Sequence, residues 1–280
     1  MTAKRKKTAR RQSAIRDTIL AILTAAIAGG VVELLTTHVA HAAGWESLKV
    51  FSGVDYSSGD YGEATKTDIV YVPLTVKYET GPWTLRATTS YIRIHGPANV
   101  VGGGDNGSII TTGTNTRLSR SGPGDILLGL TYSLDSLWAK GWFIDFTGKV
   151  KVPTADENKG LGTGKTDFTA QLDLAKILGP ITPFATLAYR KIGEPATYRL
   201  HDAWNGSIGV QYGISDSVST GISFDYRESA SPTGADPREL FGYVNVGLTE
   251  KWSIDLYGVA GLSDGSPDVA AGFQLTFRTH

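Results

Sequence analysis

The chain has 280 residues, 34 glycines, no cysteine, and 27 basic against 27 acidic side chains. Its mean hydropathy of −0.10 is too low for a bundle of membrane-spanning helices. Residues 1–42 hold 7 of the bases and 2 of the acids, which leaves 20 bases and 25 acids in the rest. This mild acidity argues against a nucleic-acid partner, and the absence of cysteine excludes disulfides and thiolate metal sites.

The N-terminus has the pattern of a secretory signal. A basic head over residues 1–18 is followed by an apolar stretch over 19–32 and by the small residues of Ala40-His41-Ala42. We expect a signal peptide over 1–42 that is cleaved after Ala42, so that the mature domain spans 43–280. A retained membrane anchor is the alternative, but Glu33 and the polar residues after it interrupt the apolar run that a spanning helix needs.

After residue 44 the hydrophobic pattern has a period of two. In the segment 142–152, one face carries Trp142, Ile144 and Phe146, while the other carries Asp145 and charged or polar neighbours. Strict alternation indicates a sheet with one apolar and one polar face. We expect twelve strands, over residues 47–56, 68–79, 83–94, 124–134, 142–152, 167–178, 182–192, 203–213, 218–228, 240–248, 252–262 and 269–278. The third and tenth of these alternate poorly.

The connections between these strands alternate in length. Tight turns are expected at 80–82, 179–180, 214–217 and 249–251. Long polar loops are expected at 57–67, 95–123, 153–166, 193–202, 229–239 and 263–268. Short turns at one end and long loops at the other are typical of an outer-membrane barrel. We therefore expect an all-β transmembrane antiparallel barrel in the bacterial outer membrane, with lipid as its surroundings and both termini on the periplasmic side.

Aromatic residues are sorted by strand end. One group lies beside the tight turns and comprises Trp83, Trp142, Trp252, Tyr78, Tyr132 and Tyr212. A second group lies where strands run into the long loops and comprises Tyr56, Tyr91, Tyr189 and Tyr226. Two such belts are expected at the two membrane boundaries. A soluble β-sandwich or lipocalin-like barrel would bury its apolar face and would have no reason to sort Trp and Tyr in this way.

Two features suggest other functions. The glycine-rich run at 159–166 resembles a phosphate-binding loop, but Lys159 stands where the motif needs its first glycine, and a strand follows instead of a helix. His95 and His201 fall at loop edges without a recognisable catalytic motif. We expect no nucleotide, no metal, no other cofactor and no enzymatic activity.

The alternation also assigns charged side chains to the inner face. An Arg or Lys on the lipid side would cost about 2–4 kcal/mol at the bilayer midplane, so the charged face must be the lumen. The expected pore-lining residues are Lys49, Lys77, Arg86, Asp145, Lys149, Lys151, Asp173, Arg190, Asp225, Arg227, Asp255 and Arg278, and Asp55 shares their face. Lys149 and Lys151 are candidates for an anion-favouring constriction, and the competing interpretation pairs them with Asp173 and other acids as braces of the wall.

Three runs resemble a known family. They are GPGDILLGLTY at 122–132, KVKVPTAD at 149–156 continued by LGTGKTDF at 161–168, and TPFATLAYR at 182–190. They are similar to outer-membrane proteins named for the meta-cleavage pathway of phenol degradation, which are generally labelled transporters. The resemblance implies a channel for small-molecule solutes, with aromatic or other hydrophobic nutrients as the solute class.

These observations predict an outer-membrane channel for passive uptake of small molecules. The first alternative is a plugged barrel with a structural or surface-interaction role through its long loops, and a barrel enzyme is the second. The sequence leaves the oligomeric state open.

Overall fold

The computed structural model describes residues 46–97, 99–101, 108–110, 118–134, 140–196 and 199–279. The expected signal peptide over 1–42 lies outside these residues. The strands are β1 Ser47–Gly59, β2 Thr67–Thr80, β3 Trp83–Gly96, β4 Asn99–Val101, β5 Ser108–Ile110, β6 Leu118–Pro123, β7 Ile126–Ser133, β8 Trp142–Val152, β9 Asp167–Lys176, β10 Ile181–Lys191, β11 Ala203–Gly213, β12 Val218–Arg227, β13 Arg238–Gly247, β14 Trp252–Gly261 and β15 Val269–Arg278. A 3₁₀ turn, η3, covers Glu157–Lys159.

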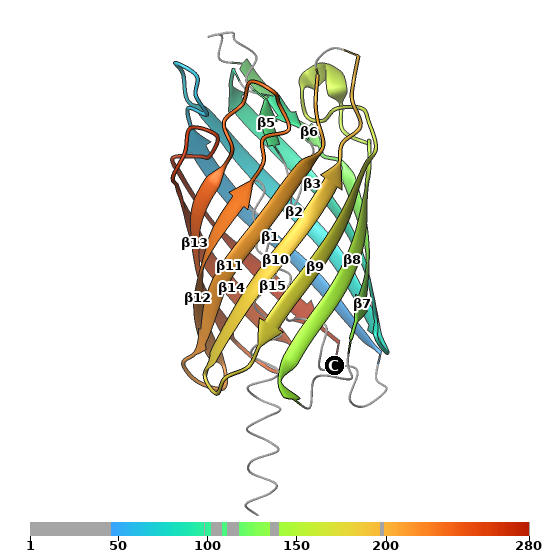
Figure 1. Cartoon of the computed structure of the whole chain (residues 1–280), viewed down its shortest axis with the longest axis vertical. Helices are drawn as coiled ribbons and strands as arrows, with labels where there is room; N and C mark the ends of the chain where they lie inside the picture. Colours follow the sequence, from blue (N-terminus) through green and yellow to red (C-terminus); the bar gives the residue numbers. More distant parts are fainter. Residues whose placement is uncertain are drawn as a thin grey trace, which may run out of the picture.

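The strands form a closed antiparallel barrel (Figure 1). From β1 to β3 and from β7 to β15, each strand pairs with the next one along the chain, and β1 pairs with β15 to complete the circle. β6 and β7 pair in succession with the upper and lower parts of β3, so they occupy one position in the wall. The thirteen strands of this sheet therefore make a barrel of twelve, as the sequence predicts.

The expected loop at 95–123 is the main departure from the sequence prediction. It contains β6 and the two short strands β4 and β5, which pair with each other. β6 extends the wall beyond a break at Gly124 and Asp125, where a Cβ on Gly124 would lie only 2.2 Å from Ser90 Oγ. This break is a bulge, and bulges interrupt the alternation by which a strand is recognised in a sequence.

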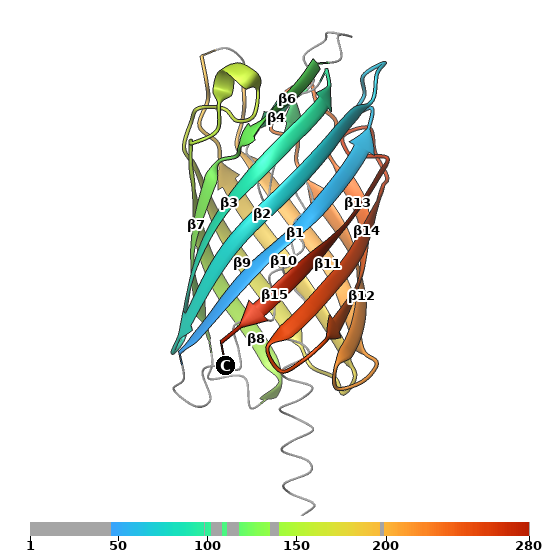
Figure 2. The ribbon, with the colours of Figure 1, turned by 180° about the vertical axis from the view of Figure 1, so that it is seen from behind.

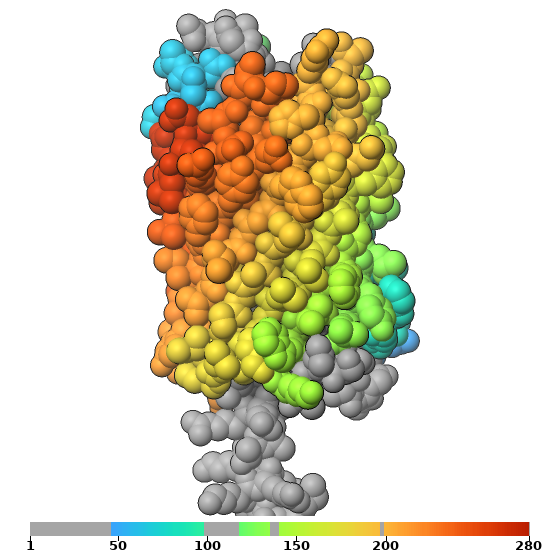
Figure 3. All heavy atoms as spheres, viewed as in Figure 1, coloured from blue at the N-terminus to red at the C-terminus, as the bar shows by residue number. Residues whose placement is uncertain are grey.

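The two faces of the wall differ as the alternation predicts. Large apolar side chains such as Leu85, Leu128, Leu187, Ile208 and Leu256 are exposed on the outer face, and Figure 3 shows this surface as a continuous wall from β8 to β13. An apolar surface of this extent indicates contact with a membrane. No helix among the described residues is long and apolar enough to cross a membrane.

The third and tenth predicted strands, β3 and β13, alternate in burial although they alternate poorly in sequence. Ile92 and Ile94 of β3 are buried on the inner face, whereas the alternating residues Arg93 and His95 are exposed. On β13, Phe241 and Tyr243 likewise point inward. Because these strands also carry apolar side chains on the inner face, their hydrophobicity does not alternate with a period of two.

The two ends of the barrel are unlike, as Figures 1 and 2 show. Tight turns and the C-terminus lie at one end, and η3 and the long connections lie at the other. β1 begins beside the end of β15, where the Thr279 N–H donates to the Leu48 carbonyl at 3.0 Å. Both ends of the barrel domain therefore lie at the short-turn end, which in outer-membrane barrels is the periplasmic one.

Both expected aromatic belts face outward. At the periplasmic end, the rings of Trp83 and Tyr132 lie 4.9 Å apart, and Lys176 Nζ lies 5.0 Å from the ring of Trp142. At the outer end, Tyr189 lies 5.0 Å from Trp204, an exposed residue that the sequence analysis left out of the belt. The two belts are separated by the length of a strand and mark the two boundaries of the membrane.

Candidate functional site

The lumen is the candidate site, because the predicted charged residues lie on its wall. Nine of the twelve are buried, namely Lys49, Lys77, Asp145, Lys151, Asp173, Arg190, Asp225, Arg227 and Asp255. Arg86, Lys149 and Arg278 are partly buried and share the inner-facing phase of their strands. The structure thus places all twelve side chains on the inner face, as the alternation predicts.

Four of these bases lie side by side near the periplasmic end. Arg278 is the register partner of Lys49, Lys49 of Lys77, and Lys77 of Arg86, so the four residues cross β15, β1, β2 and β3 in a single row. We call them the cation row. Directly opposed side chains have Cβ atoms about 4.5–5.5 Å apart, and like charges at that spacing repel.

One acid is inserted into the cation row. Glu79 Oε1 lies 2.9 Å from Lys49 Nζ and 3.5 Å from Lys77 Nζ. Over the periplasmic half of these four strands, all of them fully described, the inner face holds four bases and this one acid. Four positive charges less one negative charge leave a net charge of +3 on this part of the wall. Sequence reasoning missed Glu79, which nevertheless shares the phase of Lys77.

Acids predominate farther around the wall. Asp145 and Asp173 are register partners on β8 and β9, and Asp173 Oδ1 accepts a hydrogen bond from the Thr186 hydroxyl at 2.7 Å. On β12 and β13, Arg227 Nη2 lies 2.6 Å from Glu239 Oε1, and this pair joins two neighbouring strands. Most of these acids therefore lie on a different part of the circumference from the bases on β15–β3, whereas Asp145 is close enough to Lys77 to act on its charge.

Three aromatic rings also face the lumen, and the sequence analysis did not identify them. Phe241, Tyr243 and Tyr257 are buried on β13 and β14, and the Phe241 ring lies 5.8 Å from each of the two tyrosine rings. We call these three residues the aromatic strip. The poor alternation of β13 is the sequence signal that could have revealed them.

The tyrosines of the aromatic strip lie flat along the wall. Tyr243 is the register partner of Gly221, where a Cβ would lie 2.4 Å from the Tyr243 hydroxyl oxygen. Tyr257 is the register partner of Gly272, where an added Cβ would lie 2.6 Å from the Tyr257 hydroxyl oxygen. Each ring therefore covers a glycine of the neighbouring strand, and the Tyr243 hydroxyl donates to Gln211 Oε1 at 3.3 Å.

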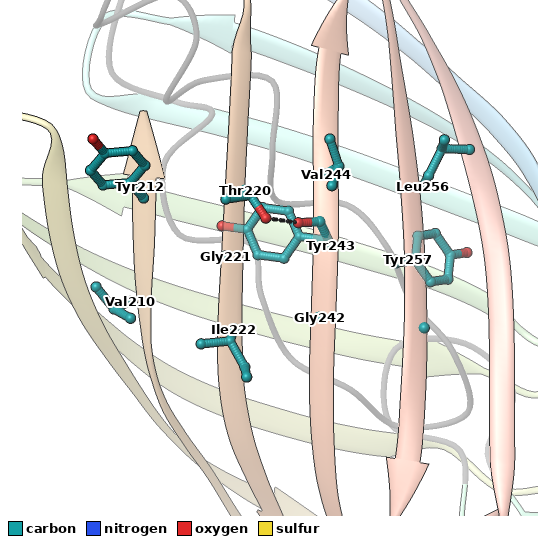
Figure 4. Close-up of a pocket in the computed structure, with 11 residues that line it drawn as sticks. Val210, Tyr212, Thr220, Gly221, Ile222, Gly242, Tyr243, Val244, Leu256 and Tyr257 are labelled. Atoms are coloured by element: carbon teal, nitrogen blue, oxygen red, sulfur yellow. Dashed lines mark hydrogen bonds between the residues drawn. The ribbon is translucent and has the colours of Figure 1, made fainter. Parts of the chain in front are cut away.

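A shallow groove of about 620 Å³ lies over the same strands (Figure 4). Much of its lining consists of outward-facing side chains such as Val210, Ile222, Val244 and Leu256. Gly242 and Gly258, which oppose each other across β13 and β14, also line it. These apolar side chains face the bilayer, so we do not assign the groove to the lumen.

The outer mouth is organised by a network of buried polar side chains. Lys151 Nζ lies 3.0 Å from Asp167 Oδ2 and 3.5 Å from Asp125 Oδ2, and it donates to the Thr163 hydroxyl at 2.9 Å. We call these four residues the mouth network. Asp125 Oδ1 also accepts the backbone N–H groups of Thr154 and Ala155, at 3.0 and 2.9 Å. These contacts support the bracing interpretation of Lys151, but its partners are Asp125 and Asp167 instead of the predicted Asp173.

The loop at 153–166 packs against the inner wall through an apolar cluster. Leu161 is fully buried and clusters with Ala155 of the same loop and with Ile69, Ile92 and Ile94 of β2 and β3. Gly160 and Gly164 adopt φ angles of +65° and +66°, which glycine reaches without strain. The glycine-rich run thus shapes a mouth loop, and β9 follows it, so it has no helix N-terminus for a phosphate.

The two described histidines, His95 and His201, do not form a catalytic arrangement. His201 Nδ1 lies 2.9 Å from the backbone oxygen of Asp202. His95 is exposed on β3 and stands in register between Asp68 and Ser119, but in the described structure its ring forms no hydrogen bond with that serine. A nucleophile and its base need such contact. Among the described residues, no group of three or more His, Cys, Asp or Glu side chains could hold a metal ion.

The comparison with known families agrees with this geometry. The family model described as "Putative MetA-pathway of phenol degradation" matches residues 53–279, nearly the whole barrel. The chain belongs to this family. Two of the three runs that suggested the family meet at the outer mouth, because Asp125 comes from the first run and both Lys151 and Thr163 come from the second. No curated protein matches the chain significantly.

Solved structures share the fold. An outer-membrane channel from Pseudomonas putida F1 has a TM-score of 0.62 and 13% identity, over 83% of this chain and 95% of that chain. The NanC porin has a TM-score of 0.50 and 10% identity, over 82% of this chain and 98% of that one. At such identities the likeness concerns the fold, which is that of a β-barrel of the bacterial outer membrane.

Proposed function

We propose that the protein is a passive channel through which small molecules cross the outer membrane. The observation that carries this proposal is the closed barrel of twelve strands with an apolar outer face and a charged inner face. Barrels of eight strands fill their interior with side chains and those of sixteen leave a wide channel, so twelve strands favour a narrow passage. The twelve charged residues of the inner wall serve as its pore lining.

Membership of the family supports aromatic or other hydrophobic compounds as solutes, because the family is described by phenol degradation. Residues 1–42 serve as a cleaved export signal in this proposal, and residues 43–280 form the mature barrel. No catalytic step is assigned to the protein.

Single-channel recording tests the proposal. Protein purified from outer membranes and added to a planar lipid bilayer should produce discrete, reproducible conductance steps. The same preparation after heat denaturation is the control and should produce none. A folded protein that inserts into the bilayer without conducting would contradict the proposal.

The plugged barrel is supported by one observation, the packing of Leu161 against the inner wall of the mouth. The variant Leu161→Ser should weaken that packing and release the loop at 153–166. A silent wild type together with a conducting Leu161→Ser variant would favour a plugged barrel. Conduction by both proteins would favour the channel.

A further inference from the structure

We propose that the lumen selects aromatic carboxylates, that is, small planar anions. The inference rests on the proposed channel function and identifies its solute class. It joins two features of the inner wall, the cation row and the aromatic strip.

The cation row supplies the selectivity for charge. Its four bases are successive register partners, an arrangement that a wall built for stability alone would avoid because like charges in direct opposition repel. Glu79 reduces this repulsion by contacting Lys49 and Lys77, and Asp145 of β8 also acts electrostatically on Lys77. Four bases with these two acids leave a net charge of +2. A low-dielectric wall with one sign of charge concentrates counter-ions.

The cation row also continues around the circumference onto β7 and β8. Gly129 follows Arg86 in register, and Lys149 follows Gly129. A Cβ on Gly129 would lie 3.7 Å from Arg86 Cβ and 3.9 Å from Lys149 Cγ, so the two cations flank a glycine that leaves space between them. Lys149 thus continues the cation row while also acting electrostatically on Asp173, whereas Lys151 belongs to the mouth network.

The aromatic strip supplies the selectivity for planar solutes. Because Tyr243 and Tyr257 lie flat over Gly221 and Gly272, they present ring faces instead of edges to the lumen. Aromatic groups stack on such faces with centroids about 4.5–7 Å apart. Neither glycine can be replaced without displacing a ring, since an added Cβ would come within 2.6 Å of a tyrosine oxygen.

The two features follow each other along the axis. The cation row lies within four residues of the periplasmic strand ends, and the aromatic strip lies nearer the middle of β13 and β14. A solute that enters from the outer mouth therefore meets ring faces first and cations second. A carboxylate on an aromatic ring can use both, because Lys and Arg form charge-assisted hydrogen bonds with carboxylates.

Reversal potentials in planar bilayers test the two features separately. The probes are potassium chloride for charge, and benzoate against cyclohexanecarboxylate for planarity at equal charge. The wild type should prefer chloride to potassium and benzoate to cyclohexanecarboxylate. The double variant Lys77→Gln with Arg86→Gln should lower the anion-to-cation permeability ratio by about tenfold and leave the preference for benzoate in place.

Replacing the aromatic strip should have the opposite effect. The double variant Phe241→Leu with Tyr243→Leu should abolish the preference for benzoate while the anion-to-cation ratio stays near its wild-type value. Lys191→Gln, which removes an exposed cation from the outer face of β10, is the matched control and should change neither ratio.

Two further variants keep the test decisive if the glutamine variant folds poorly. Lys77→Arg with Arg86→Lys keeps both charges and should retain anion preference, and Glu79→Gln should increase it. A conducting wild type without anion preference, or variants that leave both ratios unchanged, would overturn the inference. A wild type that does not conduct would instead contradict the proposed channel function.

Discussion

Lys151 illustrates what alternation can predict about a single residue. The period of two places its side chain on the inner face, and the structure confirms that position. Its partners Asp125 and Asp167 belong to other segments of the wall, and Thr163 belongs to the mouth loop. Which residues face each other depends on the register between strands and on the path of a loop, and the period of one strand contains neither.

The charge of Lys151 should therefore matter for stability more than for selectivity. In the variant Lys151→Met, Asp125 and Asp167 would keep their buried carboxylates without this cation. Removing one partner from a buried ion pair costs about 3–5 kcal/mol. We expect the midpoint of thermal unfolding in detergent to fall clearly at a fixed heating rate, while ion selectivity in planar bilayers stays unchanged. Lys165→Gln, on an exposed residue of the same loop, is the control. An unchanged midpoint would contradict the bracing function.

At the scale of elements, the strands that span the membrane were predictable and the extensions beyond it were not. β8, β12 and β15 alternate cleanly because one face meets lipid and the other meets the lumen. Above the outer belt no lipid requires apolar residues outside, so the upper parts of β2 and β3 turn Ile69 and Ile92 inward. β6 lies in this region and is separated from β7 by a bulge, so the sequence pattern does not indicate it as a strand.

The phase of β14 can be tested with two neighbouring residues. Leu256 is exposed on the outer face near the middle of the strand, so Leu256→Arg should impair assembly because a lipid-facing Arg costs about 2–4 kcal/mol at the midplane. Asp255 is buried on the inner face and accepts a hydrogen bond from Asn245 Nδ2 at 2.7 Å. Asp255→Asn keeps an oxygen at that position and should fold normally. The yield of heat-modifiable barrel in outer membranes measures both, and equal yields would mean that the phase is wrong.

At the scale of the whole molecule, the closure of the barrel determines the end at which both termini lie. An even number of strands returns the chain to the end where it began, and Leu48 and Thr279 form hydrogen bonds at that end. The sequence predicted this architecture from turn lengths and aromatic positions. It could not predict the cation row, which exists only because the registers of four strands place one base of each at the same level.

The orientation of the closed barrel gives a test on intact cells. Ala64 is exposed in the connection between β1 and β2, at the end of the long loops, and Asp216 is exposed in the tight turn between β11 and β12, at the opposite end. Outer-membrane barrels place their long loops outside the cell. A protease-cleavable tag inserted at Ala64 should therefore be cut by protease added to intact cells, whereas the same tag at Asp216 should be cut only after the outer membrane is opened.

Because both insertions lie in exposed connections, each should leave the barrel folded, which the heat-modifiable mobility of the tagged proteins can verify. Cleavage at Asp216 together with protection at Ala64 would reverse the orientation, and a solute entering from outside would then meet the cation row before the aromatic strip.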